Sequence, residues 1–582
     1  MLLRLLALST LLAGALAAQD ADLIITNARV WTGVESSPWA EAVVVRGDRI
    51  LAAGTSDVVT RHRASHTRII DAAGRLVTPG FIDNHTHFGQ AGALLLGANL
   101  LDVADANMLV QRVREARDRL PAGAWIVGGD WGAYEDWQRG SAGAAAGRSQ
   151  QRFRPTRTLI DSITPETPVL LSRWDRSEYL ANAAALSKAT LSCTSPIAGL
   201  ECERGQPTGR VSDEALRRVR AAIPPKSLEQ RLREARVALQ QLREFGVTGI
   251  HDNTPPEQLR VYQVLKQRGE LTTRIYARPT LDKWDELAAV GITHGFGDEM
   301  LKIGGLKGFV DGIMGNSTAR FYEPQLHSGK RGEWRDSTNT AATSGSGSGM
   351  MPPGNLERLI IGADAAGHWP QVHAIGDEAI DTLLTLYEKA IQTNGPRERR
   401  LRIIHSQVLR DSSVAGRFAR NAIIAEVQPY HAIDDMRWME ERIGKRARWA
   451  YAFRTLADAG VLLSFGSDWP GTNASWYPSD PLKGIYAAVT RQTLDGNPPG
   501  GWFPEERVDV ETALRAYTVN TAWAAGEESI KGSIAPGKLA DLVVLDRDLF
   551  TIPPRELKEA KVLVTILGGR VLYDATTTSR RD

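Results

Sequence analysis

The chain has 582 residues, of which 42% are hydrophobic and 24% are charged. This balance is ordinary for a folded globular protein and excludes a disordered chain and a multi-span membrane protein. Lysine and arginine number 70 against 68 aspartates and glutamates, so the net charge is only +2. A chain so nearly neutral has no field that would attract a polyanion, and we expect no nucleic-acid partner.

The first residues have the pattern of a secretory signal. The sequence MLLRLLALSTLLAGALAAQ places one arginine before a short Leu/Ala run that ends in small residues. The run is shorter than the ~20 residues that span a bilayer. We therefore expect a signal peptide at 1–18, no stable membrane insertion, and export to the bacterial periplasm or out of the cell; an uncleaved anchor is the alternative. In an oxidising compartment Cys193 and Cys202 are able to pair and close a small loop, with two free thiols as the alternative.

Both ends of the chain are rich in β-forming residues and turns. After the signal, LIITNARVWTG, AVVVRGDRILAAG and RIIDAAGRLVTPG alternate β-rich runs with glycine-containing turns. Near the C-terminus, GSIAPGKLADLVVLD and VLVTILGGRVLYD repeat that style. These runs predict one small composite β-sandwich formed by residues 19–78 plus 528–582.

Residues 79–527, between these ends, alternate short apolar runs with helix-forming segments. Such alternation is typical of parallel α/β proteins, and eight runs predict a (β/α)8 TIM-like barrel. Two stretches depart from it: an insertion at about 100–225, and a loop at about 325–355 that contains SGSGSGMMPPG and that we expect to be mobile. The eight predicted strands are 81–87, 246–252, 274–279, 306–312, 370–376, 402–407, 423–429 and 461–468.

Polar side chains fall at the carboxyl ends of these predicted strands, where barrel enzymes carry their catalytic groups. His85 and His87 are two residues apart in PGFIDNHTHF, so on a strand they point to the same face. Imidazole and carboxylate donors suit zinc and related divalent metals. The later strands add four more candidates for a metal site, which are Lys307, His373, His405 and Asp468.

These motifs resemble those of the amidohydrolase superfamily, and within it family 3, the YtcJ-like branch that includes N-substituted formamide deformylases. The resemblance covers nearly the whole mature chain. One departure is the run WDRSEYLANAAAL, in which Arg176 and Ser177 stand where the branch usually has a Gly-His pair near the substrate. The supporting strings are PGFIDNHTH, NAAAL (182–186), GQPTG (205–209), KGFVDGIMGNSTA (307–319), HAIGD (373–377), QPYHAIDD (428–435), FGSDWP (465–470) and GSIAPGKLADLVVLD (532–546).

The resemblance implies two divalent metal ions, with zinc expected. One ion would be held by His85, His87 and Asp468. The second would be held by His373 and His405, and Lys307 would be N6-carboxylated, so that its carbamate bridges the two metals. If Lys307 is unmodified, the site would hold one metal and the ammonium would balance Asp468.

The resemblance also implies the reaction, which is attack of a metal-bound hydroxide on a non-peptide C–N bond of a small amide or N-acyl substrate. Asp468 would act as general base and then general acid. An ester or lactone hydrolase, a mononuclear deaminase and, from another class, a non-catalytic binding protein are the alternatives. The candidate substrate-binding residues are His431, Trp131 and Trp174, because aromatic walls favour apolar groups. We leave a homodimer open, since closed symmetric dimers are common.

Overall fold

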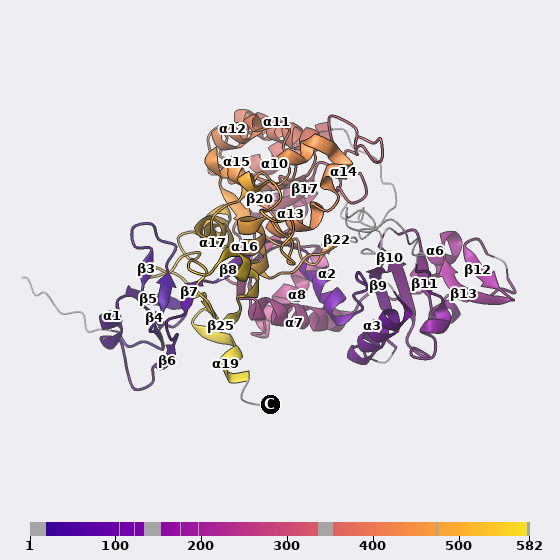
Figure 1. The fold of residues 1–582 in the computed structure, drawn as a ribbon, viewed down its shortest axis with the longest axis horizontal. Helices are drawn as coiled ribbons and strands as arrows, with labels where there is room; N and C mark the ends of the chain where they lie inside the picture. The colour runs from indigo at the N-terminus through magenta and orange to yellow at the C-terminus, as the bar shows by residue number, and fades with distance from the viewer. Residues whose placement is uncertain are drawn as a thin grey trace, which may run out of the picture.

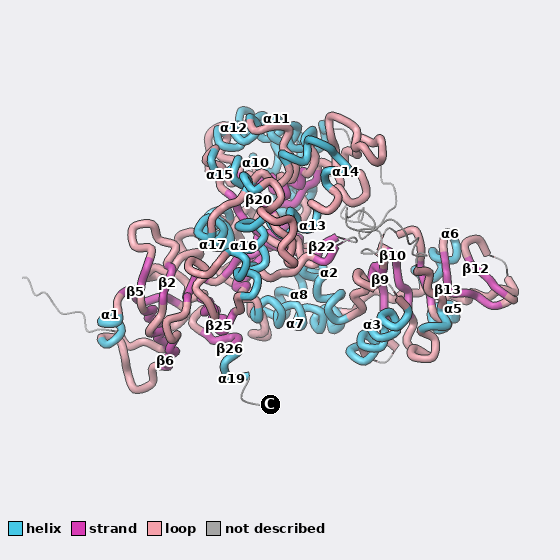
Figure 2. The backbone as a smooth tube through the Cα atoms, in the orientation of Figure 1, coloured by secondary structure: helices cyan, strands magenta, loops and turns pink. Residues whose placement is uncertain are grey.

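The structure is a computed structural model that describes residues 19–103, 105–121, 123–132, 153–174, 176–195, 197–335, 353–472 and 475–578. Figure 1 shows strands of the two chain ends on one side, a centre of parallel strands and helices, and a further sheet at the opposite side. The helices gather around the centre (Figure 2). Every helix in the described ranges is too short or too polar to cross a membrane.

The two chain ends meet in one sheet. In the six-stranded sheet, ordered β26-β25-β24-β7-β2-β3, C-terminal β24 pairs antiparallel with N-terminal β7, placing Val543 opposite Thr78. The second sheet, ordered β5-β4-β1-β6, comes from the N-terminal end alone. Val30, Leu542 and Ile566 share one buried core, so residues from both ends fill it. The strands are β1 Leu23–Thr26, β2 Arg29–Trp31, β3 Trp39–Ala40, β4 Ala42–Arg46, β5 Arg49–Gly54, β6 Arg68–Asp71, β7 Leu76–Pro79, β24 Leu542–Leu545, β25 Val562–Leu567 and β26 Arg570–Asp574.

The centre consists of two parallel sheets, ordered β16-β15-β14-β8 and β17-β18-β19-β20-β21. Their strands are almost wholly buried and rich in Ile, Val and Leu, as expected when both faces are covered. The bounds are β8 Phe81–Thr86, β14 Val247–Asn253, β15 Arg274–Arg278, β16 Leu301–Ile303, β17 Leu306–Phe309, β18 Pro370–Ala374, β19 Arg402–His405, β20 Ile424–Val427 and β21 Leu463–Phe465.

The structure corrects the prediction of a closed eight-stranded barrel in one respect, because the hydrogen-bonded ladder is not continuous. Among the described residues, the two sheets share no paired strands, and isolated parallel bridges join them at Thr86 with Trp469 and at Thr280 with Lys307. A ninth strand, β16, was not predicted. It pairs with β15 along the edge where β17 was expected, and this accounts for the break on that side.

Helices cover the outer faces of the parallel sheets. In α7, the buried residues Leu232, Ala235, Leu239 and Leu242 recur at helical spacing, and the Ser227 side chain accepts from the Gln230 N–H at the N-terminus. The helices are α1 Ser56–Thr60, α2 Phe88–Leu96, α3 Ala106–Arg119, α5 Ala183–Lys188, α6 Asp213–Ala221, α7 Leu228–Glu244, α8 Pro256–Gln267, α9 Trp284–Ala289, α10 Pro353–Ala365, α11 Asp377–Asn394, α12 Ser413–Arg420, α13 Pro429–Asp435, α14 Met439–Ile443, α15 Phe453–Asp458, α16 Pro481–Thr490, α17 Val510–Tyr517, α18 Val519–Ala524 and α19 Ala575–Thr578.

A further five-stranded sheet, ordered β12-β13-β11-β10-β9, lies between the first two strands of the centre in sequence. Its strands are β9 Ile126–Trp131, β10 Val169–Arg173, β11 Tyr179–Ala181, β12 Leu200–Glu203 and β13 Gln206–Val211. A disulfide joins Cys193 to Cys202, which lies in β12. Residues 336–352, most of the loop predicted to be mobile, lie outside the described residues, as does the predicted signal.

A buried ion pair fastens the centre to the sheet of the chain ends. Arg274, on β15, donates from Nε to Asp541 Oδ2 at 2.7 Å and from Nη2 to Oδ1 at 2.9 Å. Asp541 immediately precedes β24 and also accepts from the Gly568 N–H. Both side chains are more than nine-tenths buried, so removal of one leaves an uncompensated charge.

We predict that Asp541→Ala lowers the free energy of unfolding by about 3–5 kcal/mol, as for other broken buried ion pairs. Urea unfolding followed by circular dichroism measures this. The control is Glu286→Ala, which breaks the exposed Lys283–Glu286 pair and should lower the free energy of unfolding far less, because exposed ion pairs contribute little. Equal losses in the two variants would contradict the fastening role.

Candidate metal centre

The His-x-His motif is held in place by hydrogen bonds to the loop after β21. Asp83 accepts from the His85 N–H at 3.0 Å and from the Ser467 N–H at 2.9 Å. The Asp468 N–H donates to the His85 carbonyl at 2.8 Å, and the His87 N–H donates to the Trp469 carbonyl at 2.7 Å. The first and last strands of the centre are thereby tied at their carboxyl ends.

A glycine makes this approach possible. A Cβ on Gly466 would lie 2.2 Å from Asn84 Oδ1 and 2.7 Å from the His85 nitrogen. Any larger residue would therefore force the two segments apart. The close approach of the two segments explains why the FGSD sequence has a glycine at position 466.

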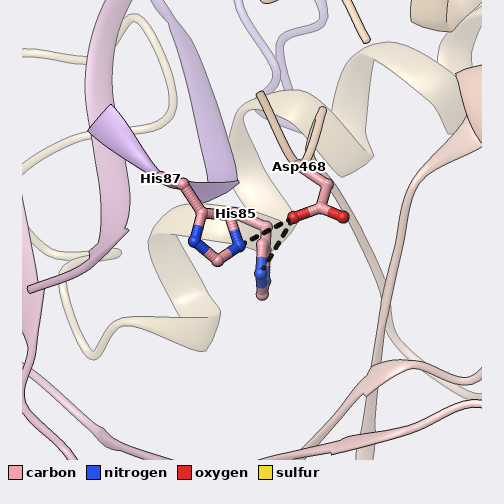
Figure 3. A group of neighbouring side chains, drawn as sticks. All are labelled: His85, His87 and Asp468. Atoms are coloured by element: carbon pink, nitrogen blue, oxygen red, sulfur yellow. Dashed lines mark ion pairs between the residues drawn. The ribbon is translucent and has the colours of Figure 1, made fainter. Parts of the chain in front are cut away.

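Figure 3 shows the first group of candidate metal donors, which consists of His85, His87 and Asp468. Asp468 Oδ1 lies 3.1 Å from His87 Nε2 and 3.4 Å from His85 Nε2. His85 is at the end of β8 and fully buried, and His87 directly follows that strand. Two imidazoles and a carboxylate at such separations fit around one divalent ion.

A second group shares the same carboxylate and consists of His405, His431 and Asp468. His431 Nε2 lies 3.8 Å from Asp468 Oδ2, is buried, and has no hydrogen-bond partner. His405 and Asp468 both adopt positive φ angles, of 73° and 59°. Such backbone strain in non-glycine residues is concentrated at functional sites.

His373 and Lys307 lie beside these groups without belonging to either. The His373 ring packs edge-on against His405 at 4.5 Å between centroids, but its Nε2 lies 2.9 Å from the Gly312 carbonyl oxygen. The Lys307 side chain is buried, with Nζ 4.8 Å from the centre of the Phe309 ring. The structure thus brings three of the other five predicted ligands, His85, His87 and His405, to Asp468, and adds His431, which was predicted only to bind substrate.

Burial keeps most of these histidines neutral. It lowers the pKa of His85, His373 and His405 well below the usual range, and that of His431 to about 4. A neutral imidazole offers the lone pair that a metal requires. For Asp468, burial alone would raise the pKa, but the contact with His87 and the nearby His405 and His431 outweigh it. The pKa of Asp468 is therefore held below its usual value, and the group is an anion.

Two side chains on β20 and just after it, which sequence reasoning missed, orient the ligand histidines. His85 Nδ1–H donates to Glu426 Oε1 at 2.8 Å, and His405 Nδ1–H donates to Gln428 Oε1 at 2.8 Å. Each bond leaves Nε2 free to face the site, as is common for metal-bound histidines. A signal existed: Glu426 and Gln428 are polar residues two apart within the apolar run IIAEVQP, so they share one face.

The two tryptophans proposed for the substrate pocket belong to the inserted sheet. Trp131 is 1% exposed and packs in the hydrophobic core of that sheet with Leu100, Val169 and Leu180. Trp131 is therefore part of this hydrophobic core. Trp174, just after β10, donates from its backbone N–H to the Trp131 carbonyl at 3.1 Å and is partly exposed.

Comparison with solved structures supports the fold. An uncharacterized metal-dependent hydrolase from Pyrococcus furiosus is 26% identical and superposes with a TM-score of 0.70 over 91% of this chain and all of its own. A second, from Pyrococcus horikoshii, is 24% identical with a TM-score of 0.69. On parallel strands with this fold, the buried imidazoles around Asp468 form a group that could hold a divalent metal ion.

The amidohydrolase family model matches residues 68–573, and the chain belongs to the amidohydrolase family. It is therefore a hydrolase of the class that acts on carbon–nitrogen bonds. Protein LONG AFTER FAR-RED 3 of Arabidopsis thaliana is 31% identical over 95% of this chain and 92% of its own length. The putative amidohydrolase YtcJ of Bacillus subtilis is 28% identical over 94% and 98%. The N-substituted formamide deformylase of Arthrobacter pascens is 27% identical over 96% and 99%.

The orientation of His405 by Gln428 can be tested by metal binding. Gln428→Met keeps the side-chain length but removes the acceptor for His405 Nδ1–H, and we predict that it weakens metal binding by about 10–100-fold. Competition with a coloured chelator measures the affinity. Gln407→Met is the control, because the Gln407 amide donates to Asp435 rather than to a histidine. Equal affinities in both variants would contradict the orienting role.

Proposed function

We propose that the protein is an exported amidohydrolase that cleaves a non-peptide amide or N-acyl bond in a small molecule with the help of two divalent metal ions, zinc by preference. The observation that supports this most directly is the position of Asp468, whose Oδ1 lies near His85 and His87 and whose Oδ2 lies 3.8 Å from His431 Nε2. The same carboxylate also groups with His405. Export rests on the apolar N-terminal segment, and cleavage after residue 18 would release the mature chain. We also propose that the two parallel sheets correspond to the (β/α)8 barrel of the family.

The donor set fits such ions. His85, His87 and Asp468 would hold one metal, and His405, with His373 or His431, would hold the second, beside Lys307. When bound, divalent ions of this kind supply a water of lowered pKa and polarise the carbonyl under attack. The histidines contribute by remaining neutral, because burial opposes their protonation.

Asp468 is placed to move protons. It is the only residue common to both histidine groups in the part of the chain that the structure describes. Since its pKa is low, it begins as a carboxylate able to accept the proton of the attacking water. The same carboxyl group would then donate that proton to the leaving amine, which departs as a neutral molecule.

Lys307 is suited to carboxylation. Burial, together with the nearby Arg278 charge, lowers the pKa of Lys307 to about 7, against the opposing charges of Glu426 and Asp468. A substantial fraction of the side chain is then a free amine at neutral pH. The amine lone pair forms a bond to the carbon of CO2, the nitrogen loses one proton, and the product carbamate is an anionic oxygen donor. An ammonium has no lone pair and would repel a metal.

We predict that Asp468→Asn folds and binds metal but loses ~10²–10⁴-fold in kcat/KM, the usual contribution of a general acid–base group. A panel of formamides, N-acyl amino acids, lactones and esters identifies the best substrate for this assay. The control is Asp480→Asn, since Asp480 caps α16 and asparagine caps equally well. Near wild-type turnover of Asp468→Asn would exclude the catalytic role.

We predict that Lys307 carries a carbamate when metal is present. Protein prepared with ¹³C-labelled bicarbonate should show one carbamate carbon resonance that is lost in Lys307→Met. Native mass spectrometry should show the matching added mass of one CO2. A metal-loaded wild type without this resonance would instead favour an unmodified Lys307 that balances Asp468.

A further inference from the structure

Asn253 faces the His-x-His motif at the end of β14. Its Nδ2 lies 3.2 Å from His85 Nε2 and 3.3 Å from His87 Nε2, the two atoms that also approach Asp468. Its Oδ1 is buried and has no hydrogen-bond partner. A buried amide oxygen without a partner is unfavourable by about 1–3 kcal/mol, so its position requires a reason.

The spacing of these atoms is that of ligands around one ion. The distances from Asn253 Nδ2 and from Asp468 Oδ1 to the Nε2 atoms of His85 and His87 all lie between 3.1 and 3.4 Å. Donors held about 2.0–2.1 Å from a tetrahedral zinc lie about 3.3 Å from one another. The Asn253 amide therefore lies as far from the two imidazole nitrogens as one metal ligand lies from another.

The orientation of the amide explains why its oxygen has no partner. Glu426 accepts the Nδ1–H of His85, so the His85 Nε2 carries a lone pair, to which an amide N–H donates. With a cation bound, that lone pair would point to the cation, and an N–H directed at the same place would be repelled. A half-turn of the amide about its last bond exchanges nitrogen for oxygen and directs an oxygen lone pair inward.

We propose that Asn253 is a ligand of the metal at the His85–His87–Asp468 site, through its side-chain oxygen. The proposal rests on the proposed function, because it presumes that this site holds a divalent ion. Asn253 also fixes where that ion lies. Its strand, β14, is bonded on one side to β8, which carries His85, and on the other side to β15. The metal would thereby draw together groups from the first, second and last parallel strands of the centre.

Three variants distinguish a ligand from a mere hydrogen-bond donor. Asn253→Leu has a similar shape without a donor or acceptor, Asn253→Asp keeps an oxygen but loses the N–H groups, and Asn394→Leu removes a partly buried amide elsewhere. Each is freed of metal with a chelator, checked for folding by thermal unfolding, and titrated with Zn²⁺ in competition with a coloured chelator.

The expected result is that Asn253→Leu weakens one zinc site by about tenfold or more. Asn253→Asp and Asn394→Leu should bind as tightly as the wild type or, for the aspartate, more tightly. If Asn253→Asp is weakened as much as Asn253→Leu, the amide acts only as a donor and the proposal is wrong. Unchanged binding in Asn253→Leu would also refute it while leaving the proposed function intact. A wild type that binds no zinc would refute both.

Discussion

The tie between the carboxyl ends of the first and last parallel strands is the constraint on which the centre depends. Asp83 holds the backbone of His85 and of Ser467 together, and the Asp468 N–H donates to the His85 carbonyl. This tie brings a carboxylate from residue 468 against imidazoles from residues 85 and 87, almost 400 positions earlier. Burial raises the pKa of Asp83 itself to about 7, against the hydrogen bonds that it accepts. The site thus places a buried acidic group where it fixes the backbone of its ligands.

A buried network of charged side chains lies next to the candidate metal site and orients one of its histidines. Glu426 is fully buried and accepts from Arg278 Nη1 at 2.8 Å and from Arg402 Nη1 at 3.0 Å, in addition to His85. A buried ion network of this kind is weak support for stability, because the desolvation of each charge is expensive. Its benefit is orientation, since a carboxylate held by two guanidinium groups cannot turn away from the imidazole. Three strands, β15, β19 and β20, therefore act through one carboxylate on a ligand carried by β8.

Much of the central architecture could be predicted from the sequence because its signals are local. Apolar runs separated by helix formers indicate parallel strands, and His85 and His87 are two residues apart on one of them. What could not be predicted depends on contacts between distant segments. The short strand β16 pairs with β15 at the edge of its sheet. The three residues Leu301–Ile303 show no pattern from which this strand could be predicted. Likewise, the contact of Asn253 with His85 depends on how β14 packs beside β8, and the approach of His431 to Asp468 depends on the position of α13. Trp131 lies in a hydrophobic core formed by residues of the insertion and the segment just before it.

We propose that this buried set of histidines and Asp468 binds two metal ions. The most direct test is the metal content per chain, measured by elemental mass spectrometry on protein purified without chelator and in the presence of bicarbonate. We predict close to two equivalents of zinc or a similar divalent ion. One equivalent would remove the bridged pair and leave a single ion at the site of His85, His87 and Asp468. No metal, together with failure to reconstitute, would contradict a metal centre at Asp468.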